Sequence, residues 1–396
     1  MTVRDKILAI EQEMKEEIIG RPEIIRSIIR ATISNQHVMV IGPPGNAKTM
    51  CFERFFGRIT GASVFNTLIT PYTSADEVMG PASIRILKDE DRIQRNTEGM
   101  FPQADYAVMD EFWNQPETLS ASLLRALNER QVFDGSKFVD IPLKMMVAAS
   151  NKLPYGEGFL AVLDRIVIRH YLPAPGATEV DLFEKILTSG LNDKPTTISK
   201  KEIEEATKEA MELPVSGRFY DFISKDLRPA LIKTEQGLSE ASVSARRWKA
   251  GINVAKAEAW LRGDDEVTAE HAIVYKDIVW NKEPQIKKVQ SLIERMCGNP
   301  QAMLDGNSLR DELKAIVEGH DADMTRAETL GDPQSGAASV TNKTKLWNDK
   351  LKEVKEDWFE RFRKDDDYKE RTQDVDLASQ MMASRAKRAY ENVMGS

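Results

Sequence analysis

The distribution of apolar residues divides the chain into a first part with alternating strand and helix patterns and a later helical part. Four apolar runs, at 38–41, 63–67, 106–109 and 145–149, have the length of buried strands. Helical periodicity lies between these runs and also covers residues 4–34. Such alternation is typical of an α/β domain, a parallel sheet sandwiched by helices.

Two segments of this α/β region predict β-hairpin inserts. Residues 83–96 carry isoleucines on either side of a polar turn. Residues 131–141 turn at Asp134 and Gly135, a strong hairpin pair. We therefore expect both inserts to project from the sheet as paired strands.

The pattern beyond the α/β region predicts helices almost throughout. We expect an α/β domain over 1–175, a small all-α domain over 176–298 and a helical extension over 299–396. Residues near 319–345 are rich in Gly, Asp, Ser, Thr and Ala, which predicts a linker or mobile loop. From Trp347 onward, apolar residues at spacings of three and four predict a charged helix that packs within this protein or on a neighbour.

Composition narrows the class of protein. The 396 residues are 41% hydrophobic and 30% charged, enough for two or three cores. The net charge of −8 argues against a dedicated nucleic-acid binder. Cys51, Cys297 and the scattered histidines show no metal spacing. The sequence has no apolar run near the ~18 residues that cross a bilayer and no signal peptide, so we expect a cytoplasmic protein without membrane insertion.

One segment points directly to a ligand. It follows the strand at 38–41, reads Gly-Pro-Pro-Gly-Asn-Ala-Lys-Thr and precedes a predicted helix. Backbone N–H groups in such a loop cradle phosphate oxygens, and the helix dipole adds to the attraction. The lysine reaches the β- and γ-phosphates, and the threonine hydroxyl binds Mg²⁺. The predicted nucleotide-binding residues are Gly42, Pro43, Pro44, Gly45, Asn46, Ala47, Lys48 and Thr49.

Polar residues at the ends of two further strands complete a candidate site for ATP hydrolysis. Asp110 and Glu111 follow the strand at 106–109. Ligands of doubly wound sheets lie beyond the carboxyl ends of strands, so Asp110 is placed to hold Mg²⁺ and Glu111 to polarise the attacking water. Asn151 ends the strand at 145–149, where its amide can orient that water or the γ-phosphate.

These motifs, in this order, resemble the AAA+ ATPases, and in detail the MoxR branch and its RavA-like members. The resemblance covers roughly residues 5–285. It implies an AAA+ P-loop core with inserts, a small all-α lid and carboxy-terminal helices. The residues that carry it are Gly42–Thr49, Val108–Trp113, Leu127–Phe133, Val147–Pro154, Val162–Ile166 and Val243–Trp248.

The resemblance also implies roles for residues outside the loop and the strand ends. Arg165, in Leu-Asp-Arg, matches the arginine finger that acts on the nucleotide of the neighbouring subunit. Arg246 matches the lid arginine that senses the γ-phosphate, with the adjacent Arg247 as an alternative. Ile19 and Gly20 match the segment that lines the adenine pocket. The two inserts match elements that face the pore of a hexameric ring.

The expected function is Mg²⁺-dependent ATP hydrolysis in a ring, most simply a hexamer, that remodels a protein partner as a chaperone does. In the MoxR branch that partner is often a protein with a von Willebrand factor A domain. The alternative is a nucleic-acid translocase or helicase, which the acidic 88–91 tip and the lone Lys137 of the second tip disfavour. The sequence departs from the RavA-like pattern after residue 298, where it has no match to a small β-rich insert.

Overall fold

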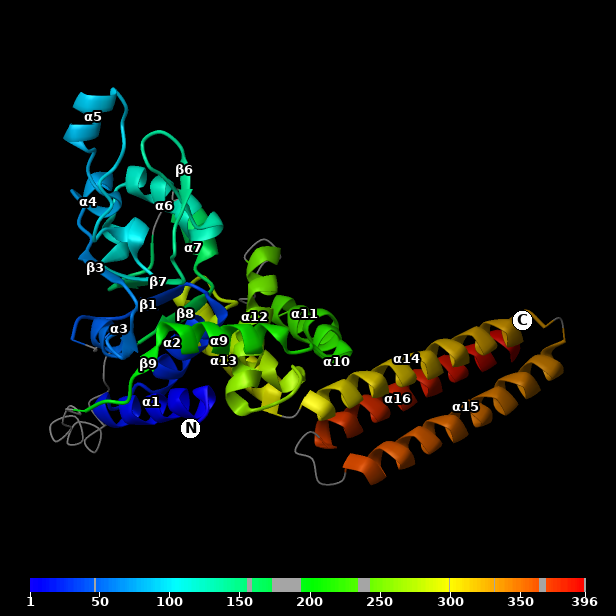
Figure 1. Ribbon diagram of the computed structural model, residues 1–396. Helices are drawn as coiled ribbons and strands as arrows, with labels where there is room; N and C mark the ends of the chain where they lie inside the picture. Colours follow the sequence, from blue (N-terminus) through cyan, green and yellow to red (C-terminus); the bar gives the residue numbers. More distant parts are fainter. Residues whose placement is uncertain are drawn as a thin grey trace. The chain divides into compact units, whose positions relative to one another are not determined.

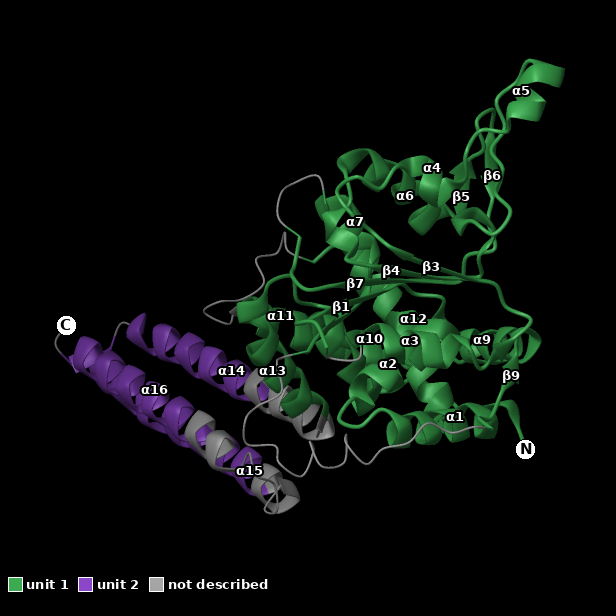
Figure 2. Ribbon diagram, turned by 90° about the vertical axis from the view of Figure 1, so that its left-hand side faces the viewer, with its two compact units in different colours: residues 1–297 green, residues 298–396 purple. Residues whose placement is uncertain are grey.

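The chain forms two compact units, an amino-terminal unit of residues 1–297 and a carboxy-terminal unit of residues 298–396 (Figure 2). The structure is a computed structural model. It describes residues 1–45, 48–154, 159–172, 194–233, 243–298, 300–330, 332–362 and 368–394.

A five-stranded parallel sheet lies at the centre of the amino-terminal unit, in the order β3-β4-β7-β1-β8. The four predicted strands are confirmed. The fifth was missed because the buried Arg169 and His170 interrupt its apolar pattern. The strands are β1 (Val38–Ile41), β3 (Val64–Leu68), β4 (Tyr106–Asp110), β7 (Met145–Ser150) and β8 (Ile168–Tyr171).

Helices cover both faces of the sheet, as Figure 2 shows with the sheet edge-on. The helical pattern predicted over residues 4–34 forms two helices, and the second begins at Pro22, whose fixed φ suits the first helical turn. One group is α1 (Val3–Glu17), α2 (Pro22–Ser34), α3 (Lys48–Phe56) and α9 (Lys200–Glu212). The other is α4 (Ala75–Met79), α6 (Glu117–Glu129) and α7 (Leu160–Arg165). Short elements between them are β2 (Ile59–Thr60), paired with β9 (Ile198–Ser199), and the 3₁₀ turns η1 (Phe101–Gln103) and η2 (Phe112–Asn114).

Of the two predicted hairpins, only the second forms. β5 (Gln131–Phe133) pairs antiparallel with β6 (Phe138–Asp140) across a turn at Gly135. Residues 83–96 instead carry a helix, α5 (Ile84–Glu90), which projects from the unit (Figure 1). The Ser83 side chain caps this helix by accepting the Ile86 N–H. The hairpin prediction was wrong because Ile84 and Ile86, expected in its first strand, lie in α5. Pairing across the insert is limited to one isolated antiparallel bridge, Ala82 to Arg95.

The rest of the amino-terminal unit is helical, as predicted for this part of the chain. The long helix α12 (Ala245–Arg262) begins at the capping residue Ser244 and packs against α2 and α9. Its neighbours are α10 (Gly217–Asp221), the π-helical turn η4 (Phe222–Leu227), α11 (Arg228–Lys233), η6 (Ala269–Asp277), η7 (Glu283–Gln285) and α13 (Ile286–Gly298).

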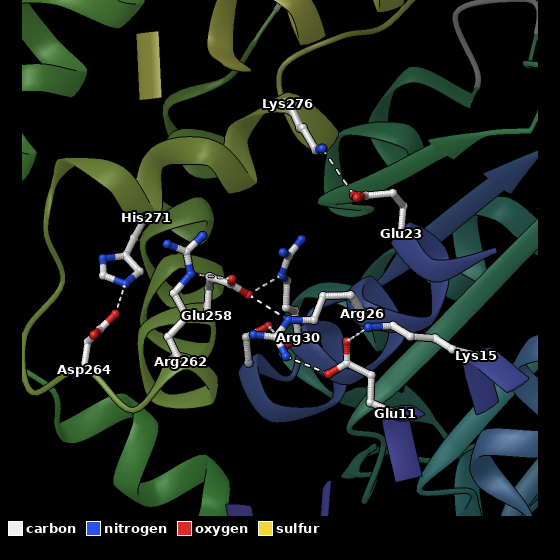
Figure 3. A network of polar contacts seen from close by, with 11 residues as sticks. Glu11, Lys15, Glu23, Arg26, Arg30, Glu258, Arg262, Asp264, His271 and Lys276 are labelled. Atoms are coloured by element: carbon white, nitrogen blue, oxygen red, sulfur yellow. Dashed lines mark hydrogen bonds and ion pairs between the residues drawn. The ribbon is translucent and has the colours of Figure 1, made fainter. Parts of the chain in front are cut away.

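A buried carboxylate connects α12 to α2. Glu258 accepts hydrogen bonds from Arg30 Nε at 2.6 Å and Arg26 Nε at 3.1 Å, and pairs with Arg262 of its own helix (Figure 3). These cations hold the pKa of Glu258 down at about 2, although burial opposes them. The helical region is therefore attached to the α/β region by a fully ionised cluster, as well as by apolar packing.

The carboxy-terminal unit is a bundle of three long helices, each packed against the other two. It contains α14 (Pro300–Glu328), α15 (Pro333–Phe362) and α16 (Tyr368–Met394). The linker predicted near 319–345 is therefore wrong, because those residues lie in α14 and α15 on either side of a short turn. Small residues there serve packing. A Cβ on Gly319 would come 2.4 Å from the Trp347 ring, so glycine lets α14 and α15 approach closely.

Candidate functional site

The phosphate loop joins β1 to α3 and depends on glycine at two positions. A Cβ on Gly42 would come 2.5 Å from the Leu172 carbonyl oxygen, so only glycine fits beside β8. Gly45 has a φ of +80°, which other residues rarely adopt. Pro43 and Pro44 lie between them, while Asn46 and Ala47 lie outside the described residues.

Lys48, the first residue of α3, extends its ammonium group toward the loop and the tip of β7. Its Nζ donates to the carbonyl oxygens of Gly42 and Pro43 and, at 2.9 Å, to Asn151 Oδ1. Burial lowers the pKa of Lys48, and the negative charges of Asp110 and Glu111 oppose that shift. A cation is thus held at the position where the sequence predicts bound phosphate.

The two adjacent acids at the tip of β4 point to different partners. Asp110 Oδ2 accepts the Thr49 hydroxyl at 3.0 Å, and Asp110 Oδ1 accepts the Glu111 N–H at 2.9 Å. Glu111 has a φ of +52°, a left-handed conformation that is uncommon for glutamate and is often found at functional sites. This backbone turn separates the two carboxylates.

Asn151 connects the lysine to the second acid. Because β7 lies between β1 and β4, its tip is next to both the phosphate loop and Glu111. The Asn151 Nδ2 group donates to Glu111 Oε1, while its Oδ1 accepts from Lys48. Sequence reasoning missed Asn114, whose Nδ2 lies 3.4 Å from Glu111 Oε2. The sequence could have indicated Asn114, because it lies three residues after Glu111, one turn along η2.

The structure brings Arg165 and Arg246 near each other. Arg246, at the start of α12, lies 3.9 Å from the Asp164 carboxylate and is half exposed. Burial lowers the pKa of Arg165 at the end of α7, and the charge of Arg246 lowers it further. Neither arginine has a contact with Lys48 or Glu111 within the described parts of the chain. Arg247 is buried, with its Nη1 2.8 Å from Asn281 Oδ1.

The segment at Ile19 and Gly20 forms the turn between α1 and α2. Gly20 has a φ of +77°, which reverses the chain there. The helices on either side of this turn, α1 and α2, both pack against α3. The turn therefore lies beside the helix that the phosphate loop opens.

The arrangement has the donors that Mg²⁺ and a triphosphate require. Hydroxyl and carboxylate oxygens are usual protein ligands of Mg²⁺. Thr49 supplies a hydroxyl and Asp110 a carboxylate, and these two oxygens lie 3.0 Å apart. On the phosphate side, Lys48 and the amino terminus of α3 lie at the loop.

Comparisons with known proteins agree with this geometry. Residues 5–213 match the family model of the MoxR domain in the MoxR-vWA-beta-propeller ternary systems, and residues 222–293 match an AAA lid domain. An uncharacterised Methanocaldococcus jannaschii protein, MJ0079, is 29% identical over 79% of this chain and 82% of its own length. Chaperone MoxR1 of Mycobacterium tuberculosis is 27% identical over 37% of each chain.

The fold agrees with a solved structure as well. A protein of Cytophaga hutchinsonii described as a candidate ATPase superposes with a TM-score of 0.57 at 19% identity, over 74% of this chain and 94% of that one. In the described residues, no helix is long and apolar enough to span a bilayer. Because the MoxR model matches more than half of this chain, the chain belongs to the MoxR family of AAA+ ATPases.

Proposed function

We propose that this chain hydrolyses ATP with Mg²⁺ in a ring-shaped, hexameric assembly and uses the energy to remodel a protein partner. The observation that carries the proposal is the continuous polar path from Lys48 through Asn151 to Glu111, beside the Thr49–Asp110 pair. These are the groups that phosphoryl transfer needs for charge neutralisation and for activation of water.

Each residue has a task that follows from its place. Lys48 exchanges its loop carbonyl partners for the β- and γ-phosphate oxygens of ATP. Glu111 accepts a proton from the attacking water, and Asn151 fixes the orientation of the Glu111 carboxylate. Mg²⁺, held by Thr49 and Asp110, would neutralise charge on the phosphate oxygens.

Two arginines support an assembly in which subunits complete one another's sites. Arg165 donates from Nη1 to the Ala161 carbonyl, and no other hydrogen bond of its guanidinium to a described residue is seen, so the group retains donors for a phosphate of a neighbouring subunit. The half-exposed Arg246 retains similar capacity, whereas the burial of Arg247 favours a structural role. We therefore assign the finger to Arg165 and the nucleotide sensor to Arg246.

The partner is proposed to be a protein with a von Willebrand factor A domain. The matched family model is named for systems in which MoxR, vWA and β-propeller domains occur together. The projecting α5 exposes Ile84 and Leu87, 70% and 46% accessible. Its two cations, Arg85 and Lys88, are balanced by Asp89 and Glu90, so the helix lacks the excess of positive charge that nucleic acid would require, which favours a protein. Whether the chain is RavA-like within the family stays a prediction.

The test uses Glu111→Gln, which is expected to abolish turnover while ATP stays bound. The variant is immobilised with ATP and Mg²⁺ and incubated with native lysate, with and without nuclease. A captured protein that resists nuclease and is absent with Lys48→Ala supports remodelling. Captured nucleic acid that nuclease removes would favour the translocase. Glu117→Gln, an exposed glutamate on α6, is the matched control and should hydrolyse ATP at the wild-type rate.

A further inference from the structure

A pocket of about 370 Å³ opens at the end of β4 and β7 that lies away from Glu111 and Asn151. Its walls are Asn35 at the end of α2, Tyr106 at the start of β4 and Lys144 just before β7. A stripe of α9 from Lys200 to Met211, at helical spacing, closes it. Because a strand rises ~3.3 Å per residue, β4 separates this pocket from the nucleotide site by roughly 13 Å.

The charges around the pocket favour an anion. Lys144, Lys200 and Lys208 line it, against the single acid Glu204. Lys144 lies 3.4 Å from Glu204, and Lys200 lies 2.7 Å from Asp105. Lys208 has no ion pair with any described residue, so its charge is available to a ligand.

Two neutral side chains in the pocket also lack partners. Tyr106 is only 1% exposed, with its ring stacked on Phe56 at 4.7 Å between centroids, and its hydroxyl makes no hydrogen bond to a described residue. Burial first, then the charges of Asp105 and Glu204, raise the pKa of Tyr106, so the hydroxyl stays protonated and can donate. The Asn35 side chain is likewise without a described partner, although its backbone carbonyl accepts from Arg130.

The hydroxyl of this otherwise buried tyrosine lines the pocket, where it can donate to a ligand. We propose that this pocket binds a small organic anion, whose carboxylate or phosphate group is held by Lys208 and the Tyr106 hydroxyl. The apolar body of the ligand packs against Ile203 and Met211. The volume is at the lower end for ligand pockets, which restricts the ligand to a small molecule.

The test measures binding of phenyl phosphate and of benzoate by calorimetry. The full chain is first saturated with ADP, so that the phosphate loop is occupied. We expect both anions to bind, and benzylamine and benzyl alcohol, which share the ring, not to bind. Failure of both anions to bind would overturn the proposal. Binding of only one identifies which acid group the pocket prefers and still supports it.

Matched variants locate the binding. Lys208→Glu should weaken the binding of phenyl phosphate roughly tenfold, which is about 1.4 kcal/mol. Tyr106→Phe keeps the stacked ring but removes the hydroxyl. It should weaken phenyl phosphate binding roughly fivefold without changing the melting temperature. Lys201→Glu makes the same charge change on α9 but does not line the pocket, so its affinity should equal that of wild type. Equal weakening by Lys201→Glu would show a general charge effect and refute the site. ATP hydrolysis is not read out, so failure here leaves the proposed function untouched.

Discussion

The Lys48 ammonium donates a hydrogen bond to the side-chain carbonyl of Asn151, with Nζ and Oδ1 2.9 Å apart. The same Asn151 donates from its amide to Glu111. One asparagine therefore contacts both the residue expected to bind phosphate and the residue expected to activate water. Because it contacts both, changing Asn151 is the most direct way to distinguish nucleotide binding from hydrolysis.

Asn151→Ala should separate the two steps. Without its amide the Glu111 carboxylate loses its orientation, so kcat should fall about 10²-fold. ADP affinity should change by less than roughly threefold, because the other loop contacts stay. Steady-state hydrolysis and ADP calorimetry measure the two effects. Asn66→Ala, an exposed asparagine bonded to Glu53, is the control. A loss of ADP binding in step with kcat would contradict this role.

Gly42→Ala should disturb the phosphate loop through a steric clash. The added methyl group would approach the Leu172 carbonyl oxygen to 2.5 Å, so β1 or β8 must shift. We expect a loss of about 1–3 kcal/mol in the free energy of unfolding, and weaker ATP binding. Gly217→Ala has open space and should lie within about 0.5 kcal/mol of wild type. Equal stability of the two variants in urea titration would disprove the contact.

Glu258→Gln should destabilise the amino-terminal unit by about 3–5 kcal/mol near neutral pH, because it leaves the buried Arg30 without its carboxylate partner. The folded pKa of Glu258, about 2, lies below its ordinary value of 4.5. Its contribution is therefore present above that value and is lost as the pH falls toward the folded pKa. The difference between wild type and Glu258→Gln should shrink across this range.

Denaturant unfolding at several pH values measures that difference. Glu205→Gln, an exposed glutamate of α9, supplies the control and should follow wild type at every pH. A difference between Glu258→Gln and wild type that stays constant down to acid pH would show that the carboxylate charge contributes nothing.

Met382→Asp should unfold the carboxy-terminal bundle. Met382 is 1% exposed and packs in a cluster with Leu313, Leu351 and Val375, where an unpaired carboxylate costs several kcal/mol. Met381→Asp places the same charge at a site 52% exposed and should be tolerated. Circular dichroism would show helix loss only for Met382→Asp, with ADP affinity retained. Similar losses in both variants would mean that the cluster does not stabilise the bundle.

Much of the core could be predicted from sequence because its signals are local. The strand at 38–41 and the turn at Gly135 were identified at their observed positions. The acids at 110 and 111 follow a buried strand, so the expected edge of the sheet does bring them beside Lys48 and Thr49. Periodicity and strand order were sufficient for these features.

The errors arose where tertiary context overrides a local pattern. Alternating isoleucines at 84 and 86 suit a strand, yet the Ser83 cap starts a helix there. Glycines at 319 and 336 suggested a loop, although they lie where Trp347 and Val393 approach. The pocket below β4 could not be foreseen either, since it joins Asn35, Tyr106 and α9 from distant parts of the chain.

The length of the helices in the carboxy-terminal unit also has a mechanical consequence. Helix α15 has 30 residues, which at 1.5 Å per residue makes a rod ~45 Å long. Packing against both α14 and α16 restrains this rod from bending, so a rotation at one end would be transmitted along its length. A turn of roughly 10° at one end would move the other end by roughly 8 Å, far more than side chains shift around a bound phosphate.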